Sequence, residues 1–185
     1  MTYARSHTGG RLRLAVGMAL LLGGLWALQH TGWLRPPSVA TLAPSSVTYS
    51  VVSVQDGDTF TVQAPTGPQR VRILGINAPE LAHDGNAAQC WGEQARAALK
   101  GLVAGHDVVL TSDPRSDDID RYGRWLRYAQ VSTIDDVGLE LITTGAAQAY
   151  YPASEPAPAR NDDYVHATET AKTAHVGMWA SCESP

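Results

Sequence analysis

Residues 47–76, VTYSVVSVQDGDTFTVQAPTGPQRVRILGI, are the part of the chain that decides its fold class. Runs of β-branched residues predict three strands within it, at residues 47–54, 60–62 and 71–76. Two turn sequences, Asp56-Gly57-Asp58 and the proline-bounded residues 65–68, separate these strands. Three strands therefore come before the first helix, which is not the order of an alternating βαβ fold.

The rest of the chain adds two strands and three helices. Apolar residues recur at helical spacing from Ala95 to Val103 and stop before Gly105, which predicts the first helix. Further elements are expected as strands at 108–110 and 126–131, a short helix at 139–142, and a last helix that begins at an Asn161 cap. Because the strands do not alternate with helices, we expect an antiparallel sheet of the α+β class, closed as a five-stranded Greek-key barrel.

The N-terminal segment has the pattern of a targeting element. Arg5, Arg11 and Arg13 lead into an uncharged apolar run over residues 14–28, and no acidic residue precedes Asp56. The run is shorter than the roughly 20 residues that span a bilayer. A cleaved signal peptide, an uncleaved membrane anchor and a buried helix therefore all stay open.

This pattern predicts three parts of the chain. We expect residues 1–34 to be a signal peptide or membrane anchor formed by one hydrophobic helix, residues 35–46 to be a Pro- and Ser-rich linker, and residues 47–182 to be the folded domain. Either targeting interpretation places the domain outside the cytoplasm. The protein is then secreted, or it is held at the membrane by an uncleaved N-terminal segment.

Composition and charge exclude several classes of protein. With 44% hydrophobic and 17% charged residues among 185, the chain can bury one core, which excludes wholesale disorder and a multi-span membrane protein. The net charge is −4, although Arg5, Arg11, Arg13 and Arg35 all precede the domain. The domain is therefore more acidic than the whole chain, so a polyanion would have to be held by a few placed arginines or through a cation.

The cysteines and histidines exclude two further classes of protein. Cys90 and Cys182 are the only two cysteines, which excludes a disulfide-dense miniprotein. In an oxidising compartment their simplest state is one disulfide that closes most of the domain, and the alternative is two free buried thiols. The six histidines have no zinc-binding spacing, so a zinc enzyme is not expected.

Three polar clusters lie at or beside predicted strand ends. They are Asp56-Gly57-Asp58-Thr59, Arg72 followed by Asn77-Ala78-Pro79-Glu80, and Asp120-Arg121-Tyr122-Gly123-Arg124. Each alone has a structural interpretation as a turn or a solvated loop. Together they supply carboxylate and amide oxygens, which suit a hard cation, and guanidinium groups, which match phosphate oxygens. This combination predicts metal-assisted cleavage of a phosphodiester bond.

The segments DGDT, VRILGINAPE, DRYGR, GLELITTGAAQAYY and a closing GMW occur in this order between residues 47 and 179. In this respect the chain resembles the staphylococcal nucleases, the thermonuclease or micrococcal type. The resemblance implies an OB-fold barrel and a phosphodiesterase of the endonuclease type. We also expect the protein to be a monomer. It also implies one Ca²⁺ ion as cofactor, DNA or RNA as substrate, and products that carry a 3′-phosphate.

The resemblance implies roles for individual residues around the phosphate. Arg72 and Arg124 match the two arginines that grip the scissile phosphate and stabilise the transition state. Glu80 matches the glutamate that acts as general base for the attacking water or orients it. Tyr122 and Tyr150 match tyrosines that contact the nucleotide.

The resemblance also implies a metal site, and here the chain departs from the family pattern. Asp58 matches a carboxylate ligand of calcium, with Asp56 and Thr59 in support. Asn77 stands where the family has a second aspartate ligand, and Ala78 replaces a threonine whose backbone carbonyl is a ligand. The change to Asn77 removes one negative charge, so we expect weak calcium binding, of the order of 10⁻⁴ to 10⁻³ M. A non-catalytic barrel that binds oligonucleotides is the alternative function.

Overall fold

The computed structural model describes residues 47–82 and 85–183, and these form the predicted barrel. Five strands close it in the order β1-β2-β3-β6-β5. Their bounds are Thr48–Val54 for β1, Thr59–Ala64 for β2, Gly67–Ile73 for β3, Asp107–Thr111 for β5 and Trp125–Gln130 for β6. The expected five-stranded barrel of the α+β class is therefore confirmed. The targeting segment and linker predicted for residues 1–46 lie outside the described residues.

The expectation of a wholly antiparallel sheet was wrong for one pair of strands. β3 and β6 run parallel, with Arg72 in register with Leu126, whereas the other barrel pairs are antiparallel. The physical reason is the long connection between them, since parallel strands need a crossover, and here a two-residue strand, one helix and β5 intervene. The parallel pair brings the chain around Arg72 beside the segment that leads into β6.

The single strand predicted at residues 71–76 is divided in two. β3 ends at Ile73, the chain turns at Leu74 and Gly75, and β4 (Ile76–Asn77) pairs with β7 (Gln148–Ala149). Gly75 has a φ of 81°, a conformation that glycine adopts without steric cost. Because of this turn, Asn77 belongs to a different sheet from Arg72, although only five positions separate them in the chain.

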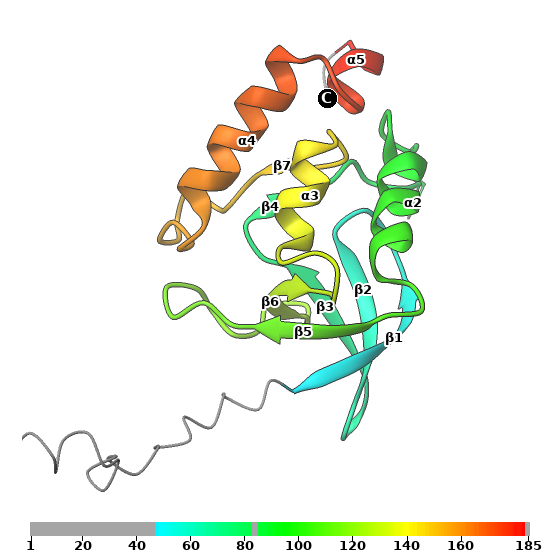
Figure 1. The fold of residues 1–185 in the computed structure, drawn as a ribbon, viewed down its shortest axis with the longest axis vertical. Coiled ribbons are helices and arrows are strands. Elements are labelled where there is room, and N and C mark those ends of the chain that lie inside the picture. Colours follow the sequence, from blue (N-terminus) through cyan, green and yellow to red (C-terminus); the bar gives the residue numbers. More distant parts are fainter. Residues whose placement is uncertain (1–46, 83–84, 184–185) are drawn as a thin grey trace, which may run out of the picture. The chain divides into compact units, whose positions relative to one another are not determined.

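Four helices are present in the described part of the chain. They are α2 (Gly92–Val103), α3 (Val137–Thr143), α4 (Asn161–Thr173) and the short α5 (Met178–Ser181). Figure 1 shows α2, α3 and α4 on the same side of the barrel strands. Among residues 47–82 and 85–183, none of these helices is long and apolar enough to span a membrane.

The predicted Asn161 cap was wrong. Arg160 occupies the cap position of α4 and makes no side-chain cap hydrogen bond, so Asn161 is the first helical residue. The Asn161 amide instead donates to the Asp162 side chain. Arg160 extends away to pair with Asp136, which caps α3 by accepting the Leu139 N–H. The ion pair thus joins the first turns of α3 and α4, and no side chain caps α4.

One core joins the barrel interior to the helices. Its largest fully buried side chains come from barrel strands, from α2 and α3, and from Tyr164 of α4; on the strands they include Phe60, Val62, Val71 and Ile73. The alternation along β3 is regular near its end, with Val71 and Ile73 buried and Arg70 and Arg72 on the opposite face. The strand that supplies core residues therefore also presents two arginines.

A polar cluster fastens the loop before α4 to the barrel. The buried Asp113 accepts hydrogen bonds from the Tyr128 hydroxyl and from the Ala159 N–H, both at 2.6 Å. Burial alone would raise the pKa of Asp113, but these hydrogen bonds and one from the Arg115 N–H outweigh it and lower the pKa. The same phenol contact and burial raise the pKa of Tyr128 to about 12. Residues 150–158, which precede this anchor, are thereby held in place.

Candidate active site

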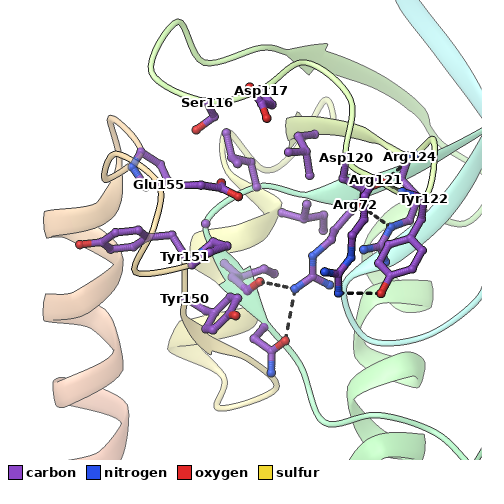
Figure 2. Close-up of a pocket in the computed structure, with 18 of the residues that line it drawn as sticks. Arg72, Ser116, Asp117, Asp120, Arg121, Tyr122, Arg124, Tyr150, Tyr151 and Glu155 are labelled. Carbon is purple, nitrogen blue, oxygen red and sulfur yellow. Dashed lines mark hydrogen bonds and ion pairs between the residues drawn. The ribbon is translucent and has the colours of Figure 1, made fainter.

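A cleft of about 980 Å³ is lined by residues from all three polar clusters and from the loop at 150–158. Figure 2 shows Arg72, Arg121 and Arg124 on one side of this cleft, with Tyr150 and Tyr151 on the other. The first side comes from β3 and from the loop before β6. The second side belongs to the loop that Asp113 anchors.

The Asp56-Gly57-Asp58-Thr59 segment is a tight turn between β1 and β2. The Asp58 N–H donates to Asp56 Oδ1 at 2.9 Å, which closes the turn. Gly57 is required because a Cβ there would lie 2.6 Å from the Cβ of Ala78 and 2.7 Å from that of Ala95. The turn therefore packs directly against the second polar cluster and α2.

Asp58 is the buried centre of the site, with 2% of its surface exposed. Its Oδ1 accepts hydrogen bonds from Arg72 Nη1 at 2.6 Å and from the Thr59 hydroxyl at 2.9 Å. Its Oδ2 accepts the Ala78 N–H at 3.1 Å. A buried carboxylate needs such partners, and the two from Arg72 and Ala78 join the first cluster to the second.

Arg72 connects Asp58 to the β3–β4 turn. Besides its ion pair with Asp58, its Nη2 donates to Asn77 Oδ1 and to the Ile76 carbonyl, each at 3.2 Å. The turn at Gly75 is what allows the side chain to reach both acceptors. The Arg72 guanidinium thus bridges the Asp58 carboxylate and the Asn77 amide oxygen, which are two of the calcium ligands that the resemblance implies.

Arg124 is oriented by Asp120, the first residue of its own cluster. Its Nε donates to Asp120 Oδ2 at 2.7 Å, and Asp120 Oδ1 accepts the Tyr122 and Arg124 N–H groups at 2.9 Å. Burial opposes the charge of Asp120, but these contacts lower its pKa. Arg124 Nη1 lies 3.4 Å from the Thr59 hydroxyl, which itself donates to Asp58. Thr59 therefore links the two arginines.

Three carboxylates lie close to one another beside Arg72. Burial and the negative charges of Asp58 and Glu80 raise the pKa of Asp56 to about 6. Asp56 and Glu80 line the cleft, whereas Asp58 lies behind Arg72. This concentration of negative charge is the kind of environment in which a cation binds favourably.

The donor set fits a hard cation in its chemistry. Asp58 and Asn77 each offer a side-chain oxygen, and both oxygens already share one cationic partner, the Arg72 guanidinium. Ala78 turns its N–H toward Asp58, and the ligand role of its carbonyl stays a prediction. Within residues 47–82 and 85–183, no group of three His, Cys, Asp or Glu side chains is arranged to hold a metal ion. A cation here would depend on amide and backbone oxygens as well.

The two predicted substrate tyrosines are exposed at the cleft. The Tyr122 hydroxyl accepts Arg121 Nη2 at 2.8 Å, and the guanidinium carbons of Arg121 and Arg124 lie 4.8 and 5.3 Å from its ring centre. Tyr150 follows β7, and its N–H donates to the Gly75 carbonyl at 2.9 Å. The rings therefore stand on opposite sides of the cleft, as Figure 2 shows.

The predicted site residues fall into two layers and one separate pair. Asp56, Arg72, Asn77, Glu80, Tyr122, Arg124 and Tyr150 line the cleft. Asp58, Thr59 and Ala78 are buried, each with 2% of its surface exposed. Cys90 and Cys182 form a disulfide and do not line the cleft.

Several residues of the cleft have no role predicted from the sequence, and three of them stand out. Asp120 lies in a predicted cluster without a role of its own, although it orients Arg124. Arg70 also lines the cleft, and its position two residues before Arg72 on one strand was a usable signal, because alternate residues share a face. Tyr151 lines the cleft beside Tyr150, and no periodic signal pointed to it.

Comparison with known proteins agrees with this geometry. The chain matches the family model described as "Staphylococcal nuclease homologue" over residues 70–181. The chain belongs to this staphylococcal nuclease homologue family. The match begins within β3 and includes Arg72, Glu80, Arg124 and the anchored loop, so the resemblance to this family is confirmed.

Several individual proteins are also similar to this chain. A "Probable endonuclease LCL3" of Leptosphaeria maculans is 36% identical over 111 residues, which are 60% of this chain and 37% of that protein. Another "Probable endonuclease LCL3", from Candida tropicalis, is 35% identical and matches 60% of this chain and 47% of its own length. "Protein ParB" of Escherichia coli is 31% identical over 150 residues, 77% of each chain. The chain therefore spans less than half of each of these two endonuclease relatives.

Proposed function

We propose that this staphylococcal nuclease homologue is an endonuclease that hydrolyses phosphodiester bonds of DNA, RNA or both. The observation that carries the proposal is the chain of contacts Arg124–Thr59–Asp58–Arg72, which holds two guanidinium groups beside one cleft. The names of the endonuclease relatives support the same activity.

In this proposal the arginines hold the phosphate. Asp120 accepts a hydrogen bond from Arg124 Nε and the Thr59 hydroxyl accepts one from Arg124 Nη1, which leaves Arg124 Nη2 for phosphate oxygens. Arg72 is held at Asp58 and Asn77 and presents its planar group at the cleft. Both groups are placed before substrate arrives, so they stabilise charge that grows on the phosphoryl oxygens without reorganising.

Glu80 is the residue proposed to handle the attacking water. It lines the same cleft as both arginines, and a carboxylate there can accept a proton from water or orient the water toward phosphorus. The water oxygen bonds to phosphorus as the bond to the 5′-oxygen breaks, the 5′-oxygen leaves as a hydroxyl with a proton from solvent, and the phosphate stays on the 3′ side. We propose 3′-phosphorylated products on this basis and from the family pattern.

We propose one Ca²⁺ ion as the cofactor, held by Asp58, Asn77 and the Ala78 carbonyl. The chemistry it supplies when bound is neutralisation and polarisation of a phosphoryl oxygen. Asp56 and Thr59 support Asp58 through the turn hydrogen bond and the Oδ1 contact. The replacement of a carboxylate by Asn77 also supports the alternative function, a barrel that binds oligonucleotides without cutting them.

We further propose that the domain works outside the cytoplasm, secreted or held at the membrane, as a monomer. The Cys90–Cys182 disulfide supports this location, because such bonds persist in oxidising compartments. The apolar residues 14–28 behind their arginines support it from the sequence.

The test is a cleavage assay with the purified full chain. Labelled single-stranded DNA and RNA are incubated in millimolar Ca²⁺ or in EGTA, beside the Glu80→Gln variant. We expect calcium-dependent cutting that falls by at least about 100-fold in Glu80→Gln, with fragments that polymerase extends only after phosphatase treatment. Binding without cutting in any divalent ion would reject the enzyme and support the binding module.

A further inference from the structure

The backbone of Glu80 is fastened to the chain just before α2. The Glu80 N–H donates to Gln89 Oε1 at 2.8 Å, and the Gln89 N–H donates to the Glu80 carbonyl at 2.9 Å. Two hydrogen bonds in opposite directions thus join residues nine positions apart. Rotation or sliding of the Glu80 peptide would break at least one of them.

Helix α2 packs onto the same peptide through its first residue. A Cβ at Gly92 would lie 2.6 Å from the Glu80 carbonyl oxygen and 3.2 Å from the carbonyl carbon, closer than real side chains approach. The φ of Gly92 is not positive, so its conformation alone does not require glycine. What requires glycine here is the close contact with Glu80.

The two residues between Gln89 and Gly92 are also constrained. Cys90 is joined to Cys182, with 5.9 Å between their Cα atoms. Trp91 has a φ of 73°, in the left-handed region that is sterically unfavourable for a non-glycine residue. Such a conformation persists where surrounding contacts impose it. The junction therefore has one defined shape, and Glu80 is attached to it.

We propose that Gln89 and Gly92 are positioning residues that determine where the Glu80 carboxylate stands in the cleft. The inference rests on the proposed function, in which Glu80 handles the attacking water. Misplacement of a reacting group by about 1 Å can cost up to roughly 100-fold in rate. The phosphate is held by arginines on β3 and before β6, so loss of this attachment lowers kcat and leaves KM unchanged.

The experiment compares two glycines of the same helix in the full chain. Gly92→Ala and Gln89→Ala are expected to lower kcat by about tenfold or more, with KM within about twofold of wild type. Gly101→Ala is the matched control, because Gly101 is also in α2 and a Cβ there meets nothing within 4 Å. It is expected to keep the wild-type kcat.

The same substitutions are then made in the Glu80→Gln background. If they act through Glu80, they change the residual rate by less than about twofold, because the group they position is already gone. A loss as large as in wild type would overturn the inference, since it would show a general effect on the fold. Circular dichroism and unfolding curves verify that each variant is folded, and Gln89→Ala carries the test if Gly92→Ala does not fold.

Failure of the inference is distinguishable from failure of the proposed function. If Glu80→Gln retains full activity, the proposed role of Glu80 is rejected, and the inference with it. If Glu80→Gln loses activity while Gln89→Ala and Gly92→Ala keep the wild-type kcat, the proposed function stands and the positioning role is overturned.

Discussion

At the scale of single residues, Arg72 is the side chain on which most contacts of the site meet. It bridges Asp58, Asn77 and the Ile76 carbonyl. We predict that Arg72→Lys lowers kcat/KM by about 100-fold or more while the fold is kept, because an ammonium retains the charge but not the planar fork. Steady-state kinetics with circular dichroism measure this. Arg96→Lys, on the exposed face of α2, is the control. Near-normal turnover of Arg72→Lys would show that Arg72 does not hold the phosphate.

Asn77 is the residue that distinguishes this chain from the family pattern. Its amide oxygen shares Arg72 with the carboxylate of Asp58. We predict that Asn77→Asp tightens Ca²⁺ binding by roughly tenfold, about 1.4 kcal/mol, because ligand charge sets calcium affinity. Isothermal titration calorimetry measures the change. An unaltered titration would show that position 77 is not a ligand.

The residue types of the site could be predicted from the sequence, but which of them are buried and which line the cleft could not. Carboxylates, amide and guanidinium groups in three motifs predicted a common cleft, and the structure brings the three motifs together. Asp58, however, is buried and paired with Arg72, and the turn at Gly75 brings Ile76 and Asn77 back to the same guanidinium. Such a bend depends on tertiary contacts between strands, which residue types alone do not encode.

At the scale of elements, Asp113 joins β5, β6 and the loop before α4. We predict that Asp113→Asn lowers the free energy of unfolding at pH 7 by about 2–3 kcal/mol, the range for a lost hydrogen bond to a charged group. The pKa of Asp113 is lower in the folded than in the unfolded chain. Its contribution is therefore fully present above about pH 4 and is lost as the pH falls through the folded pKa.

The measurement is urea unfolding of wild type and variant at pH 7 and at pH 3. The difference in free energy of unfolding between wild type and Asp113→Asn should be larger at pH 7 than at pH 3. Asp107→Asn, at an exposed position of β5, is the control and should change stability by less than about 0.5 kcal/mol. If the two proteins differ by the same free energy of unfolding at pH 7 and at pH 3, the charge of Asp113 does not contribute to holding the loop.

Periodicity predicted the long elements well and the short ones poorly. Runs of β-branched residues and the apolar stripe of α2 specified most of the barrel and its first helix. The two-residue strands β4 and β7 are too short for any period, so the sequence could not separate β4 from β3. The parallel pairing of β3 with β6 depends on the path of the whole connection, which no local pattern contains.

At the scale of the whole molecule, the disulfide closes a loop with a sequence separation of 92. We predict that Cys90→Ser/Cys182→Ser lowers the free energy of unfolding by about 4–5 kcal/mol, because the unlinked unfolded chain gains conformational entropy. Urea denaturation of the full chain measures this. Wild type treated with a reducing agent should unfold like the double variant, and a loss below about 1 kcal/mol would show that the link contributes little.

The closed barrel itself could be predicted, since five short strands on a chain of this size have few other ways to bury one face. The cleft could be predicted only in part. Its arginine side follows from motifs at strand ends, whereas the opposite side is a Pro-containing loop without periodicity. That side is fastened through the backbone N–H of Ala159, a contact that any residue except proline could make.

The cleft draws its walls from Asp56 through Pro158, and its far side is fastened just beyond, at Ala159 and Arg160. A polypeptide still emerging from a ribosome or a translocation channel has its arginines long before it has that far side. In a domain with the proposed nuclease activity, this order of synthesis delays completion of the cleft. Its second wall forms only after the residues up to Ala159 and Arg160 have been made.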